Sequence, residues 1–77
     1  MSKYSVYLGD IKPQGLVFGT EVVATFDDDH IMRVFMREVS RSMHCVLMAD
    51  NGEDTVIFVH GQPQIVKQDI HGFLCVE

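Results

Sequence analysis

The chain has 77 residues, of which 47% are hydrophobic, and its formal net charge is −5 at pH 7. This length predicts a single small domain over residues 1–77, and the apolar fraction excludes a disordered chain. The acid excess does not favour nucleic-acid binding, which relies on lysine and arginine.

Three further classes are not expected. No run of about 18 apolar residues occurs, so we expect no membrane span. The N-terminal MSKYSVYLGD has one lysine and no long apolar core, unlike a secretory signal. Cys45 and Cys75 are far apart and do not make a disulfide framework. We therefore expect a cytoplasmic protein in which both thiols are small buried hydrophobes.

The N-terminal part predicts two strands joined by a loop. Residues 3–8 alternate between β-forming side chains, with Leu8 on the same side as Tyr4 and Val6. The next seven residues, GDIKPQG, are rich in turn formers and predict a loop. Residues 16–25 predict a second strand, with a β-bulge at Gly19.

Residues 26–43, FDDDHIMRVFMREVSRSM, predict an amphipathic helix. Its main apolar residues recur at helical spacing, with Val34 and Met36 at the margins of their stripe. An alternating strand would instead bury arginines beside apolar side chains. The predicted apolar stripe contains Ile31, Met32, Phe35, Val39 and Met43, and the predicted polar face contains Asp29, Arg33, Arg37, Ser40 and Arg41.

The three consecutive aspartates fit the start of this helix. Asp27 or Asp28 can accept a hydrogen bond from a free backbone N–H of the first turn. Asp29 stands four residues before Arg33, a favourable spacing for an ion pair. Helix capping therefore explains this acidic run better than a cation site does.

The C-terminal half predicts further strands. Residues 44–49 and 55–60 flank Asn51-Gly52, a strong hairpin signal. After a turn over residues 61–64, the remaining residues predict one bent strand or two short ones. The sequence thus predicts an α+β fold in which one amphipathic helix packs on a mainly antiparallel sheet of four or five strands, in the order β-β-α-β-β with an optional final β.

Both strands of the predicted hairpin are apolar on both sides. One helix cannot cover both faces of such a sheet. A curled sheet, the loop over residues 9–15 or another chain must therefore cover the second face. We expect an uncovered face to drive binding of a protein partner, with a homodimer as the expected state. The sheet residues assigned to this surface are Val46, Met48, Val56 and Phe58.

Histidines and cysteines are the main candidates for metal binding. Their spacing matches no zinc signature, so we predict neither a metal site nor a cofactor. A cysteine could act as a nucleophile with a histidine as its base, but the sequence contains no nucleophile-elbow or phosphate-loop motif. We therefore expect no enzymatic activity. The group consists of His30, His44, Cys45, His60, His71 and Cys75.

The predicted helix carries half of the six basic residues, Arg33, Arg37 and Arg41, along one face. This stripe could meet an acidic partner or a phosphate backbone. The simpler interpretation is a solvated helix face, balanced by Asp29 and Glu38.

In size, acidity and element order, the chain resembles the small accessory proteins of phages and mobile elements, which generally act by binding. The likeness implies an inhibitor or adaptor role and no particular site residues. The leading hypothesis is a non-enzymatic protein-interaction domain that uses the arginine stripe and the uncovered sheet face. The alternatives are a small metal- or ligand-binding module built on the His/Cys group and a weak nucleic-acid contact through the arginine stripe.

Overall fold

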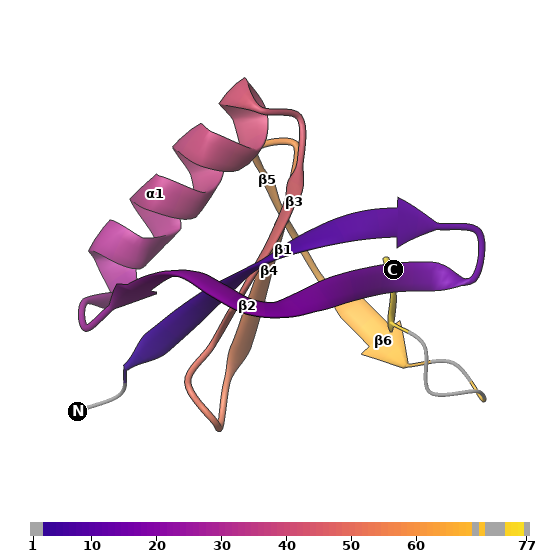
Figure 1. Cartoon of the computed structure of the whole chain (residues 1–77), viewed down its shortest axis with the longest axis horizontal. Coiled ribbons are helices and arrows are strands. Elements are labelled where there is room, and N and C mark those ends of the chain that lie inside the picture. The colour runs from indigo at the N-terminus through magenta and orange to yellow at the C-terminus, as the bar shows by residue number, and fades with distance from the viewer. Residues whose placement is uncertain (1–2, 69, 71–73, 77) are drawn as a thin grey trace.

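The computed structural model describes residues 3–68, 70 and 74–76. These residues form one helix and seven strands, and the predicted α+β fold is confirmed. The elements are β1 (Tyr4–Lys12), β2 (Gly15–Phe26), α1 (Asp29–Ser42), β3 (Val46–Asp50), β4 (Thr55–Val59), β5 (Gln62–Gln64), β6 (Val66–Gln68) and β7 (Leu74–Val76) (Figure 1). The described strand count exceeds four or five because residues 62–76 contribute three short strands.

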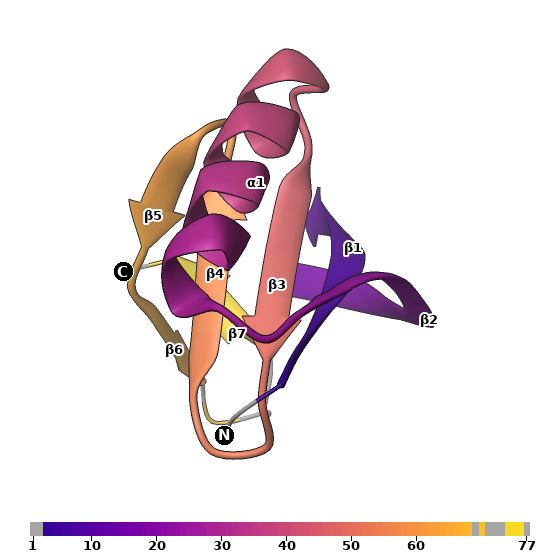
Figure 2. The same ribbon diagram turned by 90° about the vertical axis from the view of Figure 1, so that its left-hand side faces the viewer.

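The sheet curls until its two ends meet. Its strand order is β5-β4-β3-β1-β2-β7-β6, and neighbouring strands are antiparallel. The end strands β5 and β6 are separated in the chain by Ile65 alone. Because one residue spans at most about 3.6 Å, the two ends of the sheet must be close in space. Figure 2 shows β5 continuing into β6 on one side of the molecule, with β7 behind β4.

The first two strands form a long hairpin, and the prediction of a loop over residues 9–15 is wrong. Lys12 pairs with Gly15, so only a two-residue turn separates β1 from β2. Gly9 lies within β1, where a Cβ atom would overlap the Phe18 ring. This glycine therefore serves close packing between strands, which the sequence pattern does not distinguish from a turn.

Two irregularities interrupt the pairing of β1 with β2. Between Val6 and Tyr7 the register shifts by one residue, which leaves Val23 without a partner on β1. A second shift, between Tyr7 and Gly9, sets residues 19–21 opposite a single residue of β1. The predicted bulge at Gly19 is therefore confirmed. Bulges increase the local twist of a strand, which assists the curling of the sheet.

The helix begins three residues later than predicted because Phe26 ends β2. The Asp28 side chain accepts a hydrogen bond from the backbone N–H of Ile31 at 3.0 Å, so the predicted aspartate cap is confirmed. The buried stripe is rotated from the predicted one: Met36 is fully buried, whereas Ile31 and Met43 are exposed. Ser40, assigned to the polar face, is also fully buried.

Two further hairpins build the C-terminal half. The predicted hairpin of β3 and β4 is confirmed, but its loop contains four residues, 51–54. Within this loop the Asn51 carboxamide oxygen accepts from the backbone N–H groups of Glu53 and Asp54 at 2.9 and 2.6 Å. The turn between β4 and β5 consists of His60 and Gly61, both at positive φ, as a type I′ turn requires.

The described residues form two core clusters, one on each face of the sheet. The helix-side cluster packs α1 against β1, β3 and β4. The second cluster lies on the opposite face, where the start of β2 packs against β3 and β4. Buried members of the helix-side cluster are Tyr4, Val6, Met32, Met36, Leu47, Ala49 and Phe58. Those of the second cluster are Leu16, Val46 and Ile57, flanked by Phe18, Met48 and Val59.

Candidate functional site

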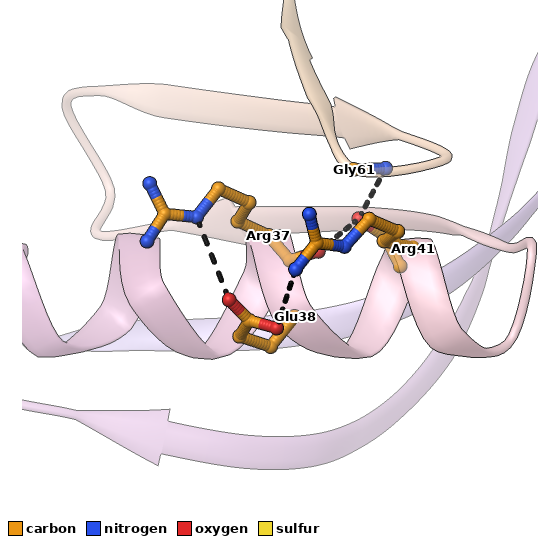
Figure 3. Close-up of polar contacts among 5 residues, drawn as sticks. Arg37, Glu38, Arg41 and Gly61 are labelled. Atoms are coloured by element: carbon orange, nitrogen blue, oxygen red, sulfur yellow. Dashed lines mark hydrogen bonds and ion pairs between the residues drawn. The ribbon is translucent and has the colours of Figure 1, made fainter.

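The arginine stripe is exposed along α1, and carboxylates of the same helix lie beside it. Arg33 Nε contacts Asp29 Oδ2 at 3.0 Å, as the spacing predicted. Glu38 lies between the other two arginines, with Nη2 of Arg41 at 2.9 Å and Nε of Arg37 at 3.8 Å (Figure 3). Exposed pairs of this kind contribute about 0–1 kcal/mol each. The stripe therefore presents mixed charge, as expected of a solvated helix face.

The last turn of α1 is anchored to the turn between β4 and β5. The Gly61 backbone N–H donates to Oγ of the buried Ser40 at 2.9 Å, as Figure 3 shows. A Cβ atom at Gly61 would lie 2.7 Å from Cβ of Arg41, so only glycine allows this approach. The contact fixes where the helix ends above the sheet, and thereby which residues of β1 the helix leaves uncovered.

The four sheet residues assigned to partner binding lie on two faces. Cross-strand neighbours share a face, and Phe58 is paired with Leu47 while Val56 is paired with Ala49. Phe58 and Val56 therefore pack in the helix-side cluster. Val46 and Met48 pack in the second cluster, where the curl of the sheet covers Val46. These residues do not form one uncovered face, and their role in partner binding stays a prediction.

His44 and His60 are brought together. Their rings meet edge to face, with centroids 5.8 Å apart. Both residues have φ near 50°, a left-handed conformation that is uncommon for residues other than glycine. Burial raises the pKa of the neighbouring Cys45 thiol. His30 lies separately, in the first turn of α1.

The structure does not place the side chains of the other two members of the His/Cys group. His71 is not among the described residues, and the side chain of Cys75 is not described. Among the residues that are described, no three His, Cys, Asp or Glu side chains gather closely enough to hold a metal ion. The wider group remains a prediction.

An apolar groove runs between the second half of α1 and the hairpin of β1 and β2. Its volume is about 180 Å³. Three of its side chains are substantially exposed: Leu8 at 47%, Val23 at 53% and Met43 at 68%. Among the described residues, none that lines it is charged. We call this surface the Leu8 groove, and its lining consists of Leu8, Val23, Phe35, Val39, Met43, Cys45 and Leu47.

Leu8 also borders two neighbouring hollows. One, of about 400 Å³, follows the irregular pairing of the hairpin between Gly9 and Phe18. The other, of about 260 Å³, extends past Met43 to the two histidines. Leu8 thus borders three hollows, of which the Leu8 groove has an apolar lining. Such a surface is typical of an interaction site.

Sequence reasoning did not identify this groove. The alternation in β1 correctly placed Leu8 on the same side as the buried Tyr4 and Val6. A signal for Val23 was present in the paired valines of β2, but the bulge that orients them depends on the register with β1. Met43 was expected to be buried with the apolar stripe of the helix.

The comparisons and the helix composition add two findings. Within the residues that the structure describes, no helix combines the length and the apolar character needed to cross a membrane. A comparison of the chain with protein-family models, curated proteins and solved structures found no match.

Proposed function

We propose that the chain is a non-enzymatic protein-interaction domain that binds a larger protein through the Leu8 groove. The observation that carries this proposal is the cluster of three exposed apolar side chains, Leu8, Val23 and Met43, around one uncharged groove. Fully burying one large apolar side chain contributes about 1.5–3 kcal/mol, so a partner that covers all three gains several kcal/mol. An inhibitor or adaptor role, in which this surface blocks or bridges a site on the partner, fits such a groove.

The arginine stripe has a secondary part in this proposal. Its side chains are exposed and lie on α1, the helix that also contributes Val39 and Met43 to the groove. Charges at the rim of an interface mainly affect the association rate and its salt dependence. We therefore assign affinity to the apolar groove and, at most, steering to the arginines.

To test the proposal, a photo-activated cross-linking amino acid is placed at residue 43 of the full chain, and the protein is expressed in cells of its source organism. We expect a specific adduct with one larger protein, which is identified by mass spectrometry. Leu8→Asp should abolish the adduct, whereas Arg37→Ala should preserve it.

Two results would contradict the proposal. One is the absence of a specific adduct at residue 43. The other is a specific adduct that survives Leu8→Asp in a protein whose circular dichroism spectrum is unchanged, because the groove would then not be the contact.

A further inference from the structure

The outer edge of β2 is open along residues 20–26. On its inner side, residues 22 and 24–26 of this segment pair with β1, and on its outer side the described pairing of β7 with β2 lies at Leu16. In the described part of the chain, no strand occupies the outer side of residues 20–26. Figure 2 shows β2 as the outermost strand on its side of the molecule. Open strand edges expose unpaired backbone N–H and C=O groups, to which another strand can add.

This edge lacks two of the usual guards against pairing, lysine and proline. Its sequence, TEVVATF, contains one charged residue, Glu21, and neither lysine nor proline. Val22 and Val23 are 44% and 53% exposed. The edge of β5 is different, because that strand has three residues with Pro63 at its centre. Short strands and prolines prevent edge pairing, so the edge of β5 is protected in a way that residues 20–26 of β2 are not.

We propose that a second copy of this chain adds to the open edge, so that the two β2 strands pair antiparallel about a two-fold axis at Val22 or Val23. An axis at Val22 sets Glu21 opposite Val23 of the second copy, and an axis at Val23 sets it opposite Thr25. In either register the two Glu21 side chains avoid facing each other, and β-branched residues pair across the seam. The surface is thus self-complementary, as an isologous two-fold interface requires.

The low charge of residues 20–26 is also compatible with the pairing of two copies. Two copies with a net charge of −5 repel each other, and the repulsion is smallest where acidic residues are fewest. The acidic run at residues 27–29 lies just beyond the segment, and both registers keep it outside the central pairs. A foreign strand would need no such symmetry, so the symmetric placement of Glu21 favours a second copy.

The bulge at Val23 limits the strength of this pairing. It interrupts the regular backbone geometry at the centre of the seam, and bulges are themselves a partial protection of an edge. The seam is also short. We therefore expect a reversible dimer whose population rises with concentration.

This inference names a partner within the class that the proposed function describes, and the two can fail separately. A monomer would leave the Leu8 groove free for a foreign protein, which the cross-linking experiment detects. A dimer through β2 would stand whether or not residue 43 yields a larger adduct.

The test combines light scattering on the full chain, from micromolar to near-millimolar concentration, with amide hydrogen exchange. We expect the mass to rise from 8.7 kDa towards twice that value. Exchange at residues 20–26 should slow over the same range, while exchange in the 51–54 loop should stay constant. Val22→Lys places a charge on the edge that faces no acidic residue in either register, and it should weaken dimerisation by about tenfold or more. Ser42→Lys adds the same charge at the exposed end of α1 and is the matched control.

Three outcomes would overturn the proposal. The first is a monomer at every concentration. The second is a dimer without added protection at residues 20–26, which places the contact elsewhere and does not depend on whether any variant folds. The third is a dimer that Val22→Lys weakens no more than Ser42→Lys does.

Discussion

The two faces of the sheet are closed by different means. On one face, α1 lies across the strands, and Met32, Met36 and Ala49 have no exposed surface. On the other face, the strands cover themselves, because the curl brings the start of β2 over β3 and β4. Leu16 is 5% exposed there, and its neighbours Phe18 and Met48 are only half-buried.

The difference shows how a chain of this size covers a sheet that is apolar on both sides. A helix is a separate rigid element with its own cap, so it fully buries the residues directly beneath it. A curl is a property of the whole sheet, and it seals the second face only to the extent that the strands bend. We therefore expect the helix-side cluster to contribute more stability per residue than the second cluster.

Met36→Ala should break the tighter face. Met36 is fully buried, and the loss of its side chain should lower the free energy of unfolding by about 3 kcal/mol. The measurement is urea unfolding, in which the dependence of the free energy on urea concentration should stay unchanged. Met43→Ala, at the exposed methionine that follows the helix, should change the free energy of unfolding by less than about 0.5 kcal/mol. Equal effects at both methionines would mean that α1 does not seal this face.

Leu16→Ala should loosen the curled face at a smaller cost, about 2 kcal/mol, because the bent strands can relax around the missing atoms. We also expect increased binding of a hydrophobic dye as Val46 and Ile57 become accessible. Val17→Ala, at the next residue and on an exposed side chain, is the control. A cost equal to that of Met36→Ala would show that the two faces are equally rigid.

Cys45 packs against the helix-side cluster, and its ionisation makes the stability of the fold depend on pH. This is the smallest of the effects that we expect. Burial raises the pKa of this thiol, so the unfolded chain ionises before the folded one as the pH rises. The stability from this group is complete below the unfolded pKa and decreases as the pH passes the folded pKa. In a Cys75→Ser chain, alkylation at mildly alkaline pH should be slower than in the same chain unfolded in urea. Met36→Ala should speed it, and equal rates in all three samples would contradict the prediction.

The local elements were predictable because their signals are local. The aspartate cap, the Asp29 and Arg33 pair and the β3–β4 hairpin each depend on residues a few positions apart. Features that depend on distant residues were not predictable. Ser40 is buried because it accepts from Gly61, twenty-one residues away in the chain. Gly9 was interpreted as a turn residue because its actual role, room for the Phe18 ring, requires the strand register.

The candidate site was harder to predict for the same reason. The alternation in β1 places Leu8 on the side that faces α1, but it does not show where along β1 the helix ends. That position is determined by the anchoring of Ser40 to the β4–β5 turn. The assignment of Val56 and Phe58 to an uncovered face required the pairing of β4 with β3, which sets Phe58 opposite Leu47.

Ile65 is the connection between the two ends of the sheet. Its side chain is 73% exposed, so it contributes little by packing. Its contribution is covalent: it holds β6 and β7 at a high effective concentration beside β2, of the order of millimolar for a short linker. Cutting the chain there would turn the last sheet contact into an encounter between two molecules. At micromolar concentration, the described pairing of β7 with β2 at Leu16 would then be too weak to keep the C-terminal segment in place.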